Sequence, residues 1–245
     1  MSGHSKWSTI KRKKGKADSA RAKVFTKVGR EISVAVKEGG ADPANNSKLR
    51  DLIAKAKANN VPNENIDRII KKASGDGNKN SYESITYEGY GPGGVAVIVE
   101  TLTDNRNRTA ADIRHYFDKF GGNLGTSGCV SFLFQEKGVL LIEGEAMDED
   151  AMMEVCLDAG AEDFEFSEQG VTVTTAPSEF SAVREQLEQK GYSFASAQVE
   201  MLPNTFTKLE TEEQKLKMRR LLDALEENED VQDVWHNLEN EDELP

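Results

Sequence analysis

The sequence predicts an α+β protein in which an N-terminal helical domain is followed by two α/β domains. Three observations support this fold class. Apolar residues recur at helical spacing in the first 75 residues, whereas β-branched and aromatic residues gather in short runs further along. The segment Gly75–Asn80 between these parts has the composition of a linker. After it, part of the chain follows the order βαββαβ, which is typical of a ferredoxin-like unit.

The helical part contains three predicted helices. Over residues 20–38 the apolar residues repeat at i, i+3 and i+7, and the pattern stops at Gly39, which suits a left-handed C-cap. A second helix is expected to begin after Asn46 or Ser47. A third carries Pro62 in its first turn and runs to the linker.

The next part is predicted to contain strands and one helix. Glycine-rich residues 91–94 form a turn between two strands, which should therefore pair in antiparallel fashion. Asp104 or Asn105 is a suitable N-cap for the helix that follows. The expected elements are strand 84–90, strand 95–102, helix 106–120 and a strand around 129–134.

The ferredoxin-like unit is predicted to be an insertion. Its expected elements are strand 138–143, helix 149–157, strands 163–167 and 171–175, helix 179–189 and strand 192–201. After it, Thr211 and Gln214 form a capping box for a helix, and a last strand covers 231–238. These two elements complete the middle domain. The predicted division is an arm at 1–18, a helical domain at 19–75, a middle domain at 81–135 plus 204–240, and the ferredoxin-like domain at 136–203.

Charge is distributed very unevenly along the chain. The net charge is −12, yet residues 1–75 contain 18 Lys and Arg against 7 Asp and Glu, a net charge of +11. Residues 136–203 contain 3 basic against 16 acidic residues, a net charge of −13. A basic end on an acidic body predicts a polyanion-binding end whose body is repelled by the same polyanion.

Several functional classes are disfavoured by composition and spacing. No apolar run approaches the ~20 residues needed to cross a bilayer, so we expect a cytoplasmic protein without membrane contact. The two cysteines and three histidines have neither metal-ligand nor general-base spacing. The glycines at 89–94 and 121–128 lack the strand and helix context of nucleotide-binding loops and indicate turns. We therefore expect no enzyme, no cofactor and no metal.

The basic residues point to nucleic acid, because Lys and Arg neutralise phosphates without reading sequence. Arm residues 1–18 lack an apolar period and should be loose until a partner binds. Trp7 can either stack on an unpaired base or anchor the arm in a buried site. The candidate nucleic-acid-binding residues are Lys6, Trp7, Lys11, Arg12, Lys13, Lys14, Lys16, Lys23, Lys27, Arg30, Lys37, Arg106, Arg108 and Lys119.

Helical phasing suggests two cationic faces. At 100° per residue, Lys23, Lys27, Arg30 and Lys37 fall opposite the apolar stripe of their helix. Cations on the helix after Asn105 offer a second phosphate contact, with plain surface exposure as the alternative. We expect charge reversal of two cations in the acidic unit to leave binding unchanged; these are Arg184 and Lys190.

Several long motifs resemble a known family. The chain is similar to the YebC/PmpR family in the segments Gly3–Trp7, Tyr87–Gly94, Thr103–Thr109, Gly121–Gly125 and Val231–Asn237. The resemblance implies three domains and no catalytic centre. Bacterial members carry the label of probable transcriptional regulators, whereas a mitochondrial relative is a translational activator of a cytochrome oxidase subunit. The family is also linked to ribosomes stalled on proline-rich sequences.

Three functions remain open at this point. A long cationic arm with one aromatic residue suits irregular RNA, so ribosomal or structured RNA, with the ribosome itself, is the favoured partner. Duplex DNA is the alternative, although no helix is rich in Arg, Asn and Gln along one exposed face. A protein-only adaptor is third, and it would leave the basic end without a use. We expect a monomer.

Overall fold

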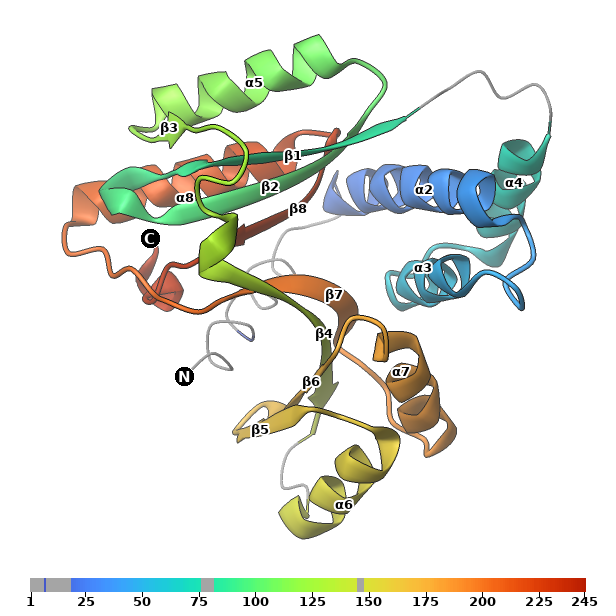
Figure 1. Ribbon diagram of the computed structural model, residues 1–245. Coiled ribbons are helices and arrows are strands. Elements are labelled where there is room, and N and C mark those ends of the chain that lie inside the picture. The colour runs from blue at the N-terminus through green and yellow to red at the C-terminus, as the bar shows by residue number, and fades with distance from the viewer. Residues whose placement is uncertain (1–6, 8–18, 76–81, 145–147) are drawn as a thin grey trace.

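Figure 1 shows the computed structural model of the chain. It describes residue 7 and residues 19–75, 82–144 and 148–245, with side chains of residues 19–22 left out. The predicted arm and the predicted linker therefore lie almost wholly outside the described residues. The remaining chain forms a three-helix unit and two four-stranded sheets. The α+β fold class is confirmed.

The helical unit comprises three helices that pack on one another. They are α2 (Ser19–Gly39), α3 (Ser47–Ala58) and α4 (Asn63–Ser74). Asn46 caps α3, because its side-chain oxygen accepts the Leu49 amide at 3.0 Å. Its side-chain nitrogen donates to the Ala35 carbonyl at 2.8 Å and so ties α3 to α2. The core between the helices includes Ile32, Leu49 and Ile66.

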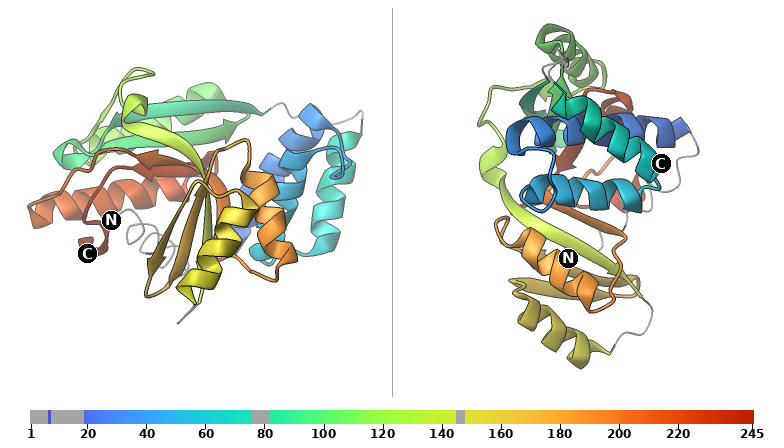
Figure 2. Two further views of the ribbon diagram at one scale, coloured as in Figure 1. Left: turned by 60° about the horizontal axis from the view of Figure 1, so that its bottom comes forward. Right: turned by 90° about the vertical axis from the view of Figure 1, so that its right-hand side faces the viewer.

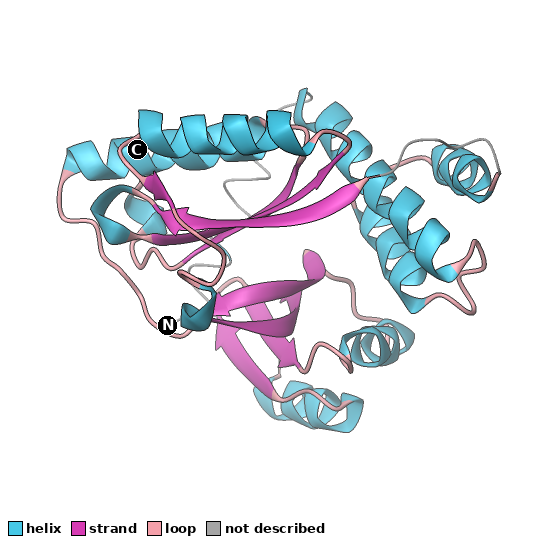
Figure 3. Cartoon of the chain, turned by 45° about the horizontal axis from the view of Figure 1, so that its top comes forward, coloured by secondary structure: helices cyan, strands magenta, loops and turns pink. Residues whose placement is uncertain are grey.

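The first sheet has the strand order β3-β1-β2-β8, and every neighbouring pair is antiparallel. Its strands are β1 (Glu83–Tyr90), β2 (Ala96–Thr103), β3 (Asn123–Leu124) and β8 (Val231–His236). Helices α5 (Arg106–Lys119) and α8 (Glu212–Glu227) cover one face, as Figure 3 shows. Val97 and Val99 of β2 point into the core on that side, which also contains Phe117 and Leu221. The opposite face of this sheet meets the rest of the molecule.

The second sheet has the strand order β5-β6-β4-β7. Its elements are β4 (Phe134–Glu143), α6 (Glu149–Ala159), β5 (Asp163–Ser167), β6 (Gly170–Thr175), α7 (Phe180–Gln189) and β7 (Ser196–Pro203). Numbered within the unit, the strands are ordered 4-1-3-2, the arrangement of a ferredoxin-like split βαβ unit. Both helices pack on one face, over Leu140 and Val173. The two sheets and their helices are seen from two further sides in Figure 2.

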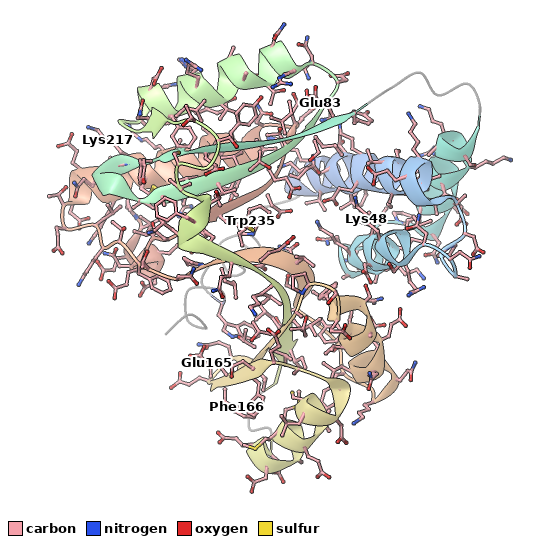
Figure 4. The ribbon with its side chains drawn as sticks, viewed as in Figure 1. Lys48, Glu83, Glu165, Phe166, Lys217 and Trp235 are labelled. Atoms are coloured by element: carbon pink, nitrogen blue, oxygen red, sulfur yellow. The ribbon has the colours of Figure 1, made fainter. Side chains whose placement is uncertain are left out.

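The predicted insertion is confirmed by the pairing of β8. This last strand pairs with β2 from Val231 to His236, although the whole second sheet lies between them in the sequence. The capping box of Thr211 and Gln214 is present at the start of α8. Trp235 of β8, labelled in Figure 4, packs with Phe134 and Met201 where the two sheets meet.

The predicted strand around residues 129–134 is wrong. Residues Ser131–Leu133 form a short 3₁₀ turn, and the fourth strand of the first sheet is instead the two-residue β3. The amides of Val130 and Ser131 donate to the Glu88 carboxylate rather than to a neighbouring strand. Residues 135–137, which lie between two predicted strands, belong to β4 because they pair with β7. The strand predicted from residue 192 begins at Ser196.

Candidate nucleic-acid interface

Most candidates on the arm lie outside the described residues. This holds for Lys6, Lys11, Arg12, Lys13, Lys14 and Lys16. Trp7 is described, and its side chain is only 8% exposed. It packs against Val139 and Leu141, on the face of the second sheet that α6 and α7 leave uncovered. Of the two alternatives for Trp7, the buried anchor is the one seen in this structure.

The cations of α2 do not form one open surface. Lys27 Nζ donates to the Glu226 carbonyl at the end of α8, at 2.8 Å. Arg30 donates to the Glu229 carbonyl at 2.9 Å and to the Asp230 carboxylate at 2.8 Å. These two side chains therefore attach the helical unit to the end of α8 and to the loop before β8. Their predicted place on one open cationic face is wrong, because the part of this face that carries Lys27 and Arg30 contacts the end of α8 and the loop before β8.

Asp230 is a buried carboxylate on which two predicted nucleic-acid ligands converge. Arg108 of α5 approaches one Asp230 oxygen at 2.7 Å, while Arg30 of α2 approaches the other at 2.8 Å. The Thr109 hydroxyl donates to the carboxylate at 2.8 Å. We call this cluster the Asp230 joint. It links α2 and α5 to the loop before β8.

The Asp230 joint keeps its carboxylate ionised. Burial by itself raises the pKa of Asp230, but hydrogen bonds from Arg108, Thr109 and Arg30 outweigh burial and lower it below the ordinary value. Removing one partner of a buried pair leaves the other charge without compensation. Arg30 and Arg108 are therefore structural in this conformation, and their role in binding nucleic acid stays a prediction.

A second charged cluster lies between helices α2 and α3 and strands β2 and β8. Lys55 of α3 is 3.2 Å from Glu31 of α2 and 3.9 Å from Asp233 of β8. Glu100 is the residue opposite Asp233 in the β2–β8 register. We call this set of three carboxylates and one lysine the Lys55 joint. Burial raises the pKa of both Glu31 and Glu100.

Arg184 also has an unexpected position. It is a buried residue of α7, and its guanidinium lies 3.1 Å from Asp51 of α3 and 2.7 Å from Glu188. Arg50 of α3 pairs with Glu185 beside it. Arg184 thus joins the helical unit to the second sheet, and it is unsuitable as a neutral control for charge reversal. Its position was missed because the acid it meets comes 133 residues earlier in the chain.

The remaining described candidates are more accessible. Lys37, Arg106 and Lys119 are exposed, and Lys23 is partly exposed. Arg106 lies 3.1 Å from Glu83, and Lys119 lies over the Phe120 ring. The structure adds exposed cations on α3 and α4 that the phasing argument omitted: Lys57, Arg68, Lys71 and Lys72. The spacing of the last three, i, i+3 and i+4, is a sequence signal that would have identified them.

Neither a metal-ligand cluster nor a reactive buried thiol is found among the described residues. Within the ranges that the structure describes, no three His, Cys, Asp or Glu side chains are grouped to hold a metal ion. Burial raises the pKa of the Cys156 thiol to about 11, which makes it a poor nucleophile. No helix in these ranges is long and apolar enough to cross a membrane.

Comparison with known proteins identifies the family. A model of the second and third domains of TACO1/YebC proteins matches residues 82–238, and a model of their N-terminal domain matches residues 5–76. The chain belongs to the TACO1/YebC family. The resemblance noted from the motifs is thereby confirmed.

Individual relatives match over nearly their full length. A protein of Ruminiclostridium cellulolyticum is 59% identical over 99% of this chain and 98% of its own length. One of Finegoldia magna is 57% identical over 98% of this chain and 100% of its own. Both are named probable transcriptional regulatory protein, a name that describes a regulator of gene expression. A crystal structure of a conserved hypothetical protein of Aquifex aeolicus is similar with a TM-score of 0.83 and 44% identity, over 92% of this chain and 93% of that one.

Proposed function

We propose that this TACO1/YebC protein is a non-enzymatic regulator of gene expression that binds RNA and acts on translation at the ribosome. The observation that supports it is the net charge of +11 on residues 1–75 against the acidic remainder. Phosphates attract the first part and repel the second, so binding would be oriented as well as tight. Ribosomes stalled on proline-rich sequences are one setting that the family resemblance suggests.

RNA is favoured over duplex DNA because two of the three helices in the helical unit are packed against other parts of the chain. A DNA reader inserts an exposed recognition helix into the major groove. Here α2 is held by Lys27 and Arg30 against the end of α8 and the loop before β8, and α3 contacts α7 through Asp51. Irregular RNA does not need a protruding helix, because shape, phosphate contacts and stacking are enough.

A DNA-binding transcriptional regulator is the second candidate. The printed names of the relatives favour it. Crosslinking the tagged protein in cells, followed by sequencing of both the RNA and the DNA recovered, distinguishes the two. Predominant ribosomal RNA supports translation, whereas recurrent promoter fragments support transcription. A protein-only adaptor would recover neither above background.

A charge-reversal pair tests whether the basic end makes the contact. The double change Lys71→Glu and Lys72→Glu should weaken binding to structured RNA and make the slope of log K against log salt shallower by about one to two units. The matched control is Lys137→Glu with Lys190→Glu, which alters the charge equally in the acidic unit. Equal losses in both variants would show that only total charge matters and would contradict a site on the helical unit.

A further inference from the structure

The loop between β3 and β4 differs in charge from the rest of the chain. Charged residues make up 30% of the sequence, yet Lys119 is the only one among residues 119–135. Residues 125–128 are exposed and read Gly-Thr-Ser-Gly. A polyanion approaching this strongly acidic protein therefore meets little local repulsion here.

Glu88 of β1 holds this loop in one conformation. Its buried carboxylate accepts the backbone amides of Gly128 at 2.8 Å, Val130 at 2.9 Å and Ser131 at 2.8 Å. Burial opposes ionisation, but the three amide donors lower the pKa of Glu88 below its usual value. The exposed loop is thus preorganised, and ordering it on ligand binding would cost little conformational entropy.

Two aromatic side chains flank the loop and face solvent. Phe132 is 70% exposed, although Val130 and Phe134 on either side of it are buried in the contact between the sheets. Tyr90 is 37% exposed, and its hydroxyl donates to the Cys129 carbonyl at 3.2 Å. The 3₁₀ turn at Ser131–Leu133 directs Phe132 outward while its neighbours pack inward.

Gly125 and Gly128 have no side chains, so the backbone beside these rings is accessible. Gly128 has a φ of +87°, which favours glycine, and no atom lies within 4 Å of where a Cβ would stand. A Cβ at Gly125 would instead meet the Cys129 sulfur at 2.4 Å. Only the short side chains of Thr126 and Ser127 rise from the exposed segment, so a flat group can approach the backbone and the adjacent rings.

We propose that Phe132, Tyr90 and the loop at 125–131 form a stacking site for an unpaired base of single-stranded RNA. This inference rests on the proposed function and names a contact outside the basic end. Two lysines lie at the same end of the first sheet. Lys119 ends α5, and Lys217, labelled in Figure 4, would contact a side chain at Gly121 and pairs with Glu213 at 2.6 Å. Aromatic rings with nearby cations and no exposed carboxylate in the loop suit a nucleic-acid strand better than a basic protein surface.

The test uses the full-length protein and a single-stranded RNA of mixed sequence that contains 2-aminopurine, whose fluorescence reports stacking. Phe132→Ala should weaken binding about five-fold or more, since base–aromatic stacking contributes ~1–3 kcal/mol. The slope of log K against log salt should stay unchanged, because no phosphate contact is lost. The fluorescence change on binding should shrink, and Phe132→Trp should restore both affinity and signal.

The matched control is Leu157→Ala, which removes a 60% exposed apolar side chain from α6 in the acidic unit and should have no effect. If Phe132→Ala binds RNA like the wild type while Lys71→Glu with Lys72→Glu weakens binding, the stacking site is refuted and the proposed function stands. If Phe132→Ala loses ribosome association but keeps naked RNA binding, the surface docks a protein and the inference is also overturned. Absence of RNA binding by the wild-type protein refutes both proposals.

Discussion

The two joints between the helical unit and the first sheet are opposite in composition. In the Asp230 joint, Arg30 and Arg108 converge on one carboxylate. In the Lys55 joint, Glu31, Glu100 and Asp233 surround one lysine. The excess of donors lowers the pKa of Asp230, whereas burial raises the pKa of Glu31 and Glu100. The helical unit and the first sheet are therefore held together by two different joints. In the Asp230 joint the carboxylate is compensated by two arginines, whereas in the Lys55 joint three carboxylates repel one another around one lysine.

This difference shows why cations near a basic N-terminus need not be ligands. The apolar core of the helical unit is internal to it, and the named contacts with the rest of the chain are polar. Interfaces between domains of one chain are commonly polar, and charged side chains are therefore expected in them. Part of the positive charge of the helical unit is thus used within the chain, and the rest faces solvent.

The largest expected effect is at the Asp230 joint. Asp230→Asn removes the carboxylate shared by two arginines and leaves the half-buried Arg30 with only the exposed Glu229 carboxylate, at 3.8 Å. We expect a loss of about 3 kcal/mol in the free energy of unfolding, measured by urea denaturation. The control is Asp104→Asn, which removes the exposed partner of Arg108 at 3.0 Å and should cost under about 0.5 kcal/mol. Equal losses of stability in Asp230→Asn and Asp104→Asn would mean that the buried carboxylate contributes no more than an exposed one.

A somewhat smaller effect is expected at the contact with the second sheet. Arg184→Met breaks the pairs with Asp51 and Glu188 and should cost about 2 kcal/mol, because both partners keep some solvent contact. Lys190→Met, which removes an exposed pair with Asp158, serves as the comparison and should change stability little. Circular dichroism during urea titration measures both. If Arg184→Met left the free energy of unfolding unchanged, the contact between α3 and α7 would contribute nothing to stability in solution.

The pH dependence of the Asp230 effect follows from its lowered pKa. A carboxyl group whose folded pKa lies below its unfolded pKa stabilises the fold fully above the unfolded value, ~3.9, and loses that contribution as pH falls through the folded value. The stability gap between wild type and Asp230→Asn should therefore be constant from about pH 5 to 7 and narrow below about pH 4. A gap that narrows near pH 6 would contradict the lowered pKa.

The smallest expected effect is at the Lys55 joint and has the opposite sign. Glu100→Gln removes one of the crowded carboxylates and should raise the urea midpoint slightly at pH 7. For a raised folded pKa, the penalty is full above that value and is relieved as pH falls through it. The advantage of Glu100→Gln should accordingly fade toward low pH. Glu83→Gln, at the exposed start of β1, should show neither effect, and a destabilised Glu100→Gln would mean that Glu100 is needed by Lys55.

The local structure of this protein follows from short-range patterns in its sequence. Asn46, Asn105 and the Thr211–Gln214 box cap the helices where their short-range hydrogen bonds predict. The order βαββαβ and the inserted topology were also readable, because hydrophobic period and turn residues act over a few neighbours. The separation of charge between the N-terminal part and the rest is likewise a property of the sequence alone.

Which charged side chains face solvent depends on contacts between distant parts of the chain. Helical phasing placed Arg30 opposite an apolar stripe, but it had no information on Asp230, 200 residues away. The strand expected at 129–134 is a turn because the buried Glu88 carboxylate, some 40 residues earlier, takes its amides. The Trp7 anchor depends in the same way on Val139 and Leu141. Ion pairs and buried contacts form between residues that are close in space, and a local pattern in the sequence does not record that distance.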